Sequence, residues 1–242
     1  NTSNIKNVTL TTSNIIGQDY VGSVIGGTID INNADNCNVS GTVTGRSYVG
    51  GIIGYSYHGG DPKHFHTNHD FTGTVTSTTS YVGGIIGYGR CTSISGCNVN
   101  ATINGASYVG GIAGYNGWNG PTIQTSTAIG TINATGNYVG GVVGQVGHTI
   151  TVTGITISDT LTINSSNSTY VGGIIGGMGG SCTISYCNVS TGISGRDNIG
   201  GIYGYTPNAN TSIYVNNNTF SGTVSGKNNV GGIGGKSEYY NT

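Results

Sequence analysis

The sequence predicts an all-β fold: a single-chain β-solenoid, or β-helix, of about eight coils with roughly 30 residues in each coil. Three observations carry this prediction. A glycine-rich phrase recurs along the chain, a short alternating strand precedes it, and no segment is rich in the residues that form helices. One repeat of this length cannot bury its own apolar face, so the copies are expected to stack on one another.

The recurring phrase is an aromatic residue or Asn, an aliphatic residue, Gly-Gly, two mostly aliphatic residues and a final Gly; the first copy has Ser23 for the second Gly. Its copies lie 27 to 33 residues apart, which makes residues 1–242 a single repeat domain. They start at Tyr20, Tyr48, Tyr81, Tyr108, Tyr138, Tyr170, Asn198 and Asn229. Glycine permits a positive φ at coil corners and close approach of backbones in a narrow core, and we expect both uses here.

A strand in which small polar and β-branched residues alternate lies just before most copies, as in residues 39–45. Alternation places the two kinds of residue on opposite faces of the strand. The expected inward residues are Val43, Val75, Ile103, Ile132, Ile163, Ile193 and Val224. The expected outward ladder includes Thr42, Thr44, Thr74, Thr76, Thr102, Thr131, Thr162 and Thr223, with Asn or Ser at some equivalent positions.

The repeat length favours a solenoid over a propeller, because a four-stranded propeller blade needs about 40 to 45 residues. Neighbouring coils of a solenoid lie about 4.8 Å apart, so eight coils form a rod of roughly 40 Å.

Composition excludes several classes of partner. Gly is 47 of 242 residues, charged residues are 6%, and the net charge is −1. The 7 Lys and Arg residues are scattered, which argues against nucleic-acid binding. No apolar run approaches the roughly 20 residues that cross a bilayer, so we expect no membrane insertion. The first residues carry no signal-peptide pattern and suggest the start of a mature chain or of a fragment.

No catalytic constellation is found in the sequence, and we expect neither enzymatic activity nor a cofactor. Hydrolysis by paired carboxylates needs two acids placed together. The acids fall at different points of the repeat: Asp19, Asp30, Asp35, Asp61, Asp70, Asp159, Asp197 and Glu238. No nucleophile elbow, phosphate loop or dinucleotide fingerprint accompanies them.

A histidine-rich insertion at residues 58–70 is the one candidate metal site. His64, His66 and His69 would suit Zn or Cu, together with Asp61 or Asp70. Their spacing matches no established zinc motif. The alternative is an exposed polar loop.

Four of the five cysteines form two similarly placed pairs. Cys91–Cys97 and Cys182–Cys187 each lie within one coil, which favours two disulfides and an oxidising compartment. The alternative is four buried thiols. Cys37 has no partner in its coil and is expected to be a free, mostly buried thiol.

Glycosylation sequons are slightly more frequent than chance. Besides Asn1, the candidate acceptors are Asn7, Asn38, Asn100, Asn133, Asn164, Asn167, Asn188, Asn210 and Asn217.

The phrase resembles the GLUG motif, a short glycine-rich repeat of adhesin-like cell-surface proteins and of some IgA-specific metallopeptidases. The resemblance lies in residues 49–55 and 82–88, with a Gly-Thr-Val-Thr-Gly strand at 41–45, and it extends over nearly the whole chain. Ile stands where the family more often has Leu. The peptidases carry a separate zinc domain, and its His-Glu-x-x-His signature is absent from this sequence.

Two functions follow as hypotheses. The first is a non-catalytic structural or adhesive rod at the cell surface or outside the cell. Its open ends are covered by neighbouring domains of a longer surface protein, or pair with further copies head to tail in a filament. The second is a ligand-binding face, in which the outward Thr, Asn and Ser ladder binds glycans or ice.

Overall fold

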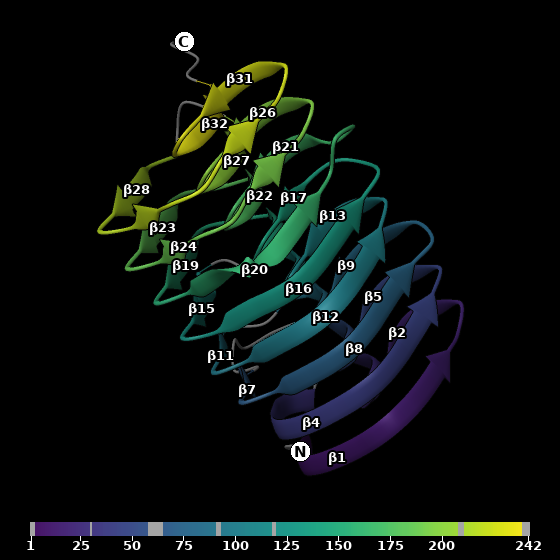
Figure 1. Cartoon of the computed structure of the whole chain (residues 1–242). Helices are drawn as coiled ribbons and strands as arrows, with labels where there is room; N and C mark the ends of the chain where they lie inside the picture. Colours follow the sequence, from purple (N-terminus) through teal and green to yellow (C-terminus); the bar gives the residue numbers. More distant parts are fainter. Residues whose placement is uncertain are drawn as a thin grey trace.

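The protein is described by a computed structural model that covers residues 3–29, 31–57, 65–90, 93–117, 120–207 and 211–238. The predicted fold is confirmed. The chain forms an all-β parallel solenoid of about seven turns, with about 29 residues per turn and no helix among these residues. Figure 1 shows the coils stacked in sequence order from the N-terminus to the C-terminus.

Two small parallel sheets carry the glycine-rich phrase, and each has eight strands. The first consists of β2 (Asp19–Gly22), β5 (Ser47–Gly50), β9 (Ser80–Gly83), β13 (Ser107–Gly110), β17 (Val139–Gly140), β21 (Thr169–Gly172), β26 (Asp197–Gly200) and β31 (Asn228–Gly231). The second consists of β3 (Ile25–Ile29), β6 (Ile53–Tyr57), β10 (Ile86–Gly89), β14 (Ala113–Asn116), β18 (Val143–Val146), β22 (Ile175–Met178), β27 (Tyr203–Thr206) and β32 (Gly234–Ser237).

A third, 16-stranded sheet closes each coil. Its strands fall into two groups, which we call the long arm and the short arm. The long arm contains β8 (Asp70–Ser77), β12 (Asn98–Gly105), β16 (Thr127–Ala134), β20 (Thr156–Asn164), β24 (Asn188–Val189), β25 (Ile193–Ser194), β29 (Thr219–Phe220) and β30 (Val224–Ser225). The short arm contains β7 (Phe65–Thr67), β11 (Ser93–Ser95), β15 (Thr122–Gln124), β19 (Ile150–Thr153), β23 (Cys182–Ser185) and β28 (Ile213–Asn216). β1 (Ser3–Ile16) and β4 (Ile31–Gly45) are long enough to run through both arms.

The core is a set of stacked apolar columns inside the coils. The predicted inward column is confirmed, since Val43, Val75, Ile103, Ile132, Ile163 and Ile193 are buried and pair in register from strand to strand. Val224 is half-buried because it belongs to the last coil. Parallel strands in register place like residues above one another, so each column excludes water along the rod.

The phrase glycines are needed for close backbone approach. A Cβ on Gly110 would lie 2.0 Å from the carbonyl oxygen of Ala113 in the same coil, and one on Gly111 would lie 2.1 Å from that of Gly141 in the next coil. The other expected use, positive φ at the corners, is confirmed for Gly96 and Gly154 at the end of the short arm but is wrong for the phrase. Its glycines have no positive φ, and the corner is formed by the residue that opens the phrase.

Two corners in each coil are left-handed turns. The first lies at the Tyr or Asn that opens the phrase, with φ between 52° and 66°. The second lies at the end of the short arm, at Asn7, Asn36, Asn68, Gly96, Thr125, Gly154, Tyr186 and Asn217. Asn and Gly adopt this region readily, but an aromatic residue does so at a cost. The tyrosine corners therefore need compensating contacts.

Candidate functional site

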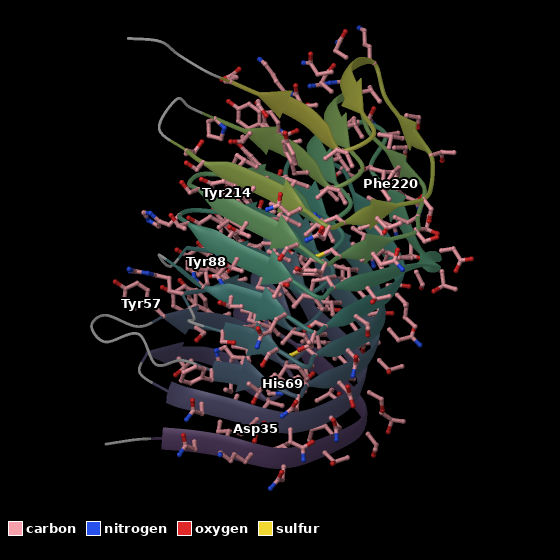
Figure 2. The ribbon with its side chains drawn as sticks, turned by 90° about the vertical axis from the view of Figure 1, so that its left-hand side faces the viewer. Asp35, Tyr57, His69, Tyr88, Tyr214 and Phe220 are labelled. Atoms are coloured by element: carbon pink, nitrogen blue, oxygen red, sulfur yellow. The ribbon has the colours of Figure 1, made fainter. Side chains whose placement is uncertain are left out.

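Stacked tyrosines form the most regular surface feature, which we call the tyrosine array. Its first column contains the corner residues Tyr20, Tyr48, Tyr81, Tyr108, Tyr138 and Tyr170, whose neighbouring ring centroids are 4.5 to 5.1 Å apart. Its second column contains Tyr55, Tyr88 and Tyr115, stacked at 5.2 and 4.8 Å. Figure 2 shows Tyr57 and Tyr88 on one side of the stack. Offset stacking supplies the contacts that the strained corners need.

The two columns interlock edge to face. Each second-column ring packs against two first-column rings: Tyr88, for example, meets the edges of Tyr48 and Tyr81 at 5.8 and 5.6 Å. Sequence reasoning noted the aromatic residue that opens the phrase but assigned it no role. The signal was the Tyr that directly follows four copies of the phrase, at positions 55, 88, 115 and 205.

Packing within the array changes the acidity of its phenols. Burial, followed by neighbouring tyrosines, raises the pKa of Tyr81 and of Tyr88 to about 12. The same causes raise the pKa of Tyr55. Burial favours the neutral phenol because the phenolate loses hydration.

We expect a spectrophotometric titration of the 16 tyrosines to show a late ionisation step near pH 12. The double variant Tyr81→Phe/Tyr88→Phe should lose two residues' worth of absorbance from that step and none from the earlier step. Circular dichroism on the same samples verifies that the coils remain folded. A single step near pH 10 for all tyrosines of the folded protein would contradict this expectation.

The outward Thr and Asn ladder is in register, as the alternation predicted. Thr42, Thr74, Thr102, Thr131 and Thr162 pair in one column along the long arm. The next column holds Thr44, Thr76, Asn104, Asn133 and Asn164. Thr223 lies on the exposed surface of the last coil. In the second column, Asn133 donates to Asn104 at 2.8 Å and Asn164 donates to Asn133 at 2.9 Å. These amides bond to each other, and glycan or ice binding by the ladder stays a prediction.

The histidine insertion differs from the exposed loop that was one of its two alternatives. His64 lies outside the described residues, so the proposed triad is not tested. His66 and His69 are 0% exposed and lie in the core, not in an exposed loop. Figure 2 labels His69 inside the coils. Strand register explains this, because His66 pairs with Ala34 and Ile94, which both face inward. Among the described residues, no three His, Cys, Asp or Glu side chains are placed to bind a metal ion.

His69 caps a backbone group of the neighbouring coil. The residue after each short-arm corner faces inward, and at this place the Nδ1 of His69 accepts a hydrogen bond from the Cys37 N–H at 3.2 Å. Ser126 and Asn218 do the same for the N–H groups of Cys97 and Cys187, at 3.1 and 2.9 Å. Burial, opposed by the charges of Asp35 and Asp70, lowers the pKa of His69 to about 4.

The described cysteines are thiols. Cys37, Cys97, Cys182 and Cys187 are free and buried, which confirms the prediction for Cys37. The predicted Cys182–Cys187 disulfide is wrong. Cys182 opens β23 and Cys187 follows the corner at Tyr186, so a four-residue strand and a turn lie between the two thiols. Cys91, the predicted partner of Cys97, lies outside the described residues.

The carboxylates of Asp19, Asp35 and Asp197 form hydrogen bonds or ion pairs with nearby side chains. Asp35 accepts hydrogen bonds from Thr67 at 2.7 Å and Asn68 at 3.0 Å, and these bonds lower its pKa. Asp19 pairs with Arg46 and Asp197 with Arg196, and hydrogen bonds from these guanidiniums lower the pKa of both acids. A general acid needs the opposite shift. Asp30 and Asp61 lie outside the described residues.

Most candidate glycosylation acceptors are accessible. Asn7, Asn100, Asn164, Asn167, Asn188 and Asn217 are exposed, Asn38 and Asn133 are half-buried, and Asn210 lies outside the described residues. Their modification stays a prediction.

Comparison with known proteins identifies no relative: no family model, curated protein or solved structure matches this chain. In the described part of the chain, no helix has the length and apolar character needed to cross a bilayer.

Proposed function

We propose that this chain is a non-catalytic structural or adhesive rod of an extracellular or cell-surface protein, and that copies of it stack head to tail. The GLUG-like phrase supports the location and the adhesin-like class. One observation carries the stacking: the two ends of the rod expose the same apolar columns.

At the N-terminal end, Ile5, Leu10 and Ile15 of β1 are only half-buried, although their side chains pack against the core. At the C-terminal end, Val215, Phe220 and Val224 are half-buried in the same way. Strand register places Ile5 in the column of Val215, Leu10 in that of Phe220 and Ile15 in that of Val224. A second copy added by the step that relates neighbouring coils would continue all three columns.

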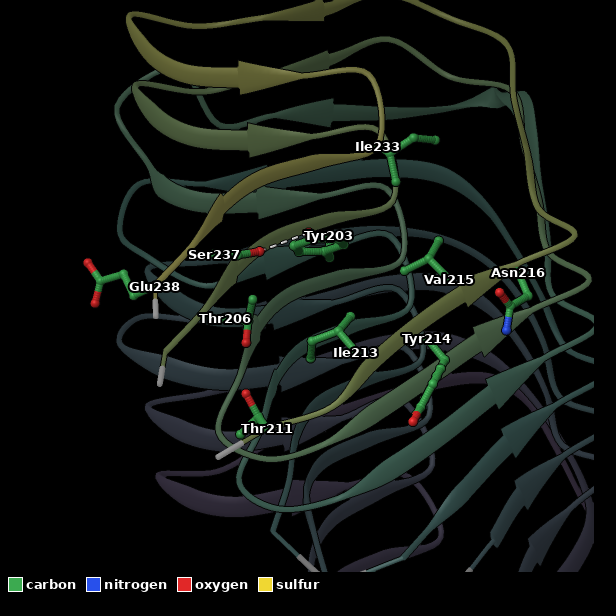
Figure 3. A pocket seen from close by; sticks show the side chains of 10 residues that line it. All are labelled: Tyr203, Thr206, Thr211, Ile213, Tyr214, Val215, Asn216, Ile233, Ser237 and Glu238. Carbon is green, nitrogen blue, oxygen red and sulfur yellow. Dashed lines mark hydrogen bonds between the residues drawn. The ribbon is translucent and has the colours of Figure 1, made fainter. Parts of the chain in front are cut away.

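The last coil, at the C-terminal end, also exposes large apolar side chains to solvent. Val230 is 43% exposed and Ile233 is 46% exposed, whereas their counterparts Ile199 and Ile202 in the preceding coil are 0% exposed. Figure 3 shows a cavity of about 550 Å³ beside Ile233, lined also by Tyr203, Ile213 and Tyr214. The strands of this coil are paired along one edge only, so their backbone groups are available to a following strand.

A glycine at this end supplies a sharp test. A Cβ added to Gly232 would have no atom within 4 Å, whereas one added to Gly201, its counterpart one coil earlier, would lie 2.0 Å from the carbonyl oxygen of Gly232. A methyl group at position 232 therefore meets nothing in one chain but would crowd a following coil; Ser23, at the same position of the first copy, keeps its next coil at a longer N–H to Gly51 oxygen distance of 3.4 Å.

We expect negative-stain electron microscopy of the wild-type chain at rising concentration to show fibres of uniform width. Gly232→Ala should form fibres only at a higher concentration than the wild type, with an unchanged circular dichroism spectrum. Tyr186→Ala, on an exposed side chain one coil before the end, is the control variant and should still form fibres.

Wild-type rods that remain single at every concentration would overturn the stacking and favour neighbouring domains as the cover of both ends. Fibres formed equally well by Gly232→Ala would overturn the proposed contact.

A further inference from the structure

Four positions of the second column lack a tyrosine. Gln145 and Lys236 carry other side chains, whereas Gly27 and Gly177 leave gaps, and only one of these gaps is filled. Gly27 and Gly177 occupy positions where Tyr55, Tyr88, Tyr115 and Tyr205 place a ring, as strand pairing shows. At Gly177, an added Cβ would lie 2.5 Å from the Tyr138 ring, so a neighbouring side chain already fills the space. At Gly27 the nearest atom would be the Cβ of Tyr20 at 3.3 Å.

A cavity of about 520 Å³ lies at the open gap, lined by Tyr20, Gly27, Thr28 and Tyr55. We call it the ring slot. In the next coil, the face of Tyr88 that points along the rod is covered by Tyr55 at 5.2 Å, with the rings 19° from parallel. Gly27 supplies no such ring to Tyr55, whose other ring contacts are Tyr20 at 4.9 Å, inclined by 62°, and Tyr57 of the same strand at 6.3 Å.

The rest of the array shows what fits such a slot. A second-column ring stacks on the ring of the next coil and meets the edge of the first-column tyrosine of its own coil. Tyr88 does so with Tyr115 at 4.8 Å and with Tyr81 at 5.6 Å. The ring slot offers the same two surfaces, the face of Tyr55 and the side of Tyr20, which is 48% exposed.

We infer that the ring slot binds a small phenolic ring, stacked on Tyr55 and flanked by Tyr20. Offset stacking and edge-to-face packing favour an aromatic ring over a saturated ring of the same size. Thr28 adds a hydroxyl-bearing side chain to the lining. This inference is independent of the proposed stacking, because all four lining residues belong to one chain.

The experiment is a titration with 4-methylphenol, followed by amide chemical shifts at a dilution where the chain is monomeric. We expect saturable shifts centred on Gly27 and Thr28, with a dissociation constant in the millimolar range that suits one small ring. Gly27→Tyr should fill the slot from within and weaken binding at least tenfold. Tyr55→Ala should weaken it about fivefold to tenfold, and 4-methylcyclohexanol should bind several-fold more weakly than 4-methylphenol.

Tyr214→Ala is the control variant, because this exposed tyrosine lies outside the array, and it should bind as the wild type does. The inference is overturned if the shifts centre on the cavity near Tyr203 and Tyr214, if the saturated ring binds equally well, or if Tyr55→Ala binds unchanged. The Tyr55→Ala measurement keeps the test decisive if Gly27→Tyr does not fold.

Discussion

Between pH 7 and pH 4, wild-type protein is expected to lose about 3 kcal/mol more unfolding free energy than the His69→Asn variant. His69 is fully buried, and burial lowers its pKa to about 4, against an ordinary value of 6.5. Between these values the unfolded chain binds a proton that the folded chain does not. Stability therefore falls as the pH drops through this window.

Asparagine is the suitable replacement, because Asn218 already caps the Cys187 N–H at the equivalent corner. Asp35 and Asp70 face His69 electrostatically, and both remain in the variant. Urea unfolding at pH 7, 6, 5 and 4 measures the difference. His148→Asn, at an exposed histidine, should follow the wild type. Parallel pH profiles for wild type and His69→Asn would refute the assignment.

Gly111→Ala is expected to destabilise the folded chain by about 3 kcal/mol. Its Cβ would lie 2.1 Å from the carbonyl oxygen of Gly141 and 2.9 Å from the Cβ of Ala128. Neither neighbour is the end of a flexible side chain, so relief requires two coils to move apart and lengthen the hydrogen bonds between them.

Gly232→Ala is the matched control, at the same position of the phrase in the last coil, where the added methyl group meets nothing within 4 Å. Its effect should stay within about 1 kcal/mol. Chemical denaturation of dilute, monomeric samples compares the two. Equal losses would show that glycine is retained there for reasons other than the approach of the next coil.

Periodicity was sufficient to predict the fold and the inward column, since both depend on local rules. A phrase repeated about every 30 residues requires stacking, and alternation in a strand assigns Val43 and Thr42 to opposite faces. Glycine spacing likewise located the phrase. The same reasoning misassigned the corner, because it credited glycine with a positive φ that the structure gives to Tyr48 and its equivalents.

Sites that depend on distances across the coil were harder to predict from the sequence. Cys182 and Cys187 are five positions apart in the sequence, but a strand and a corner separate them in space. His66 and His69 suggested an exposed loop because polar residues surround them in the sequence. Pairing with β4 and β11 turns His66 inward, and the corner at Asn68 turns His69 inward.

The sequence by itself determined the coil, its apolar columns and its outward ladder, because hydrophobic burial and strand alternation act over a few residues. Only the tertiary structure decided the tyrosine array, the ring slot at Gly27 and the capping role of His69. Each of these arises between side chains about 30 residues apart, and parallel register brings them within about 5 Å. Which neighbour each one meets therefore depends on the stacking of whole coils.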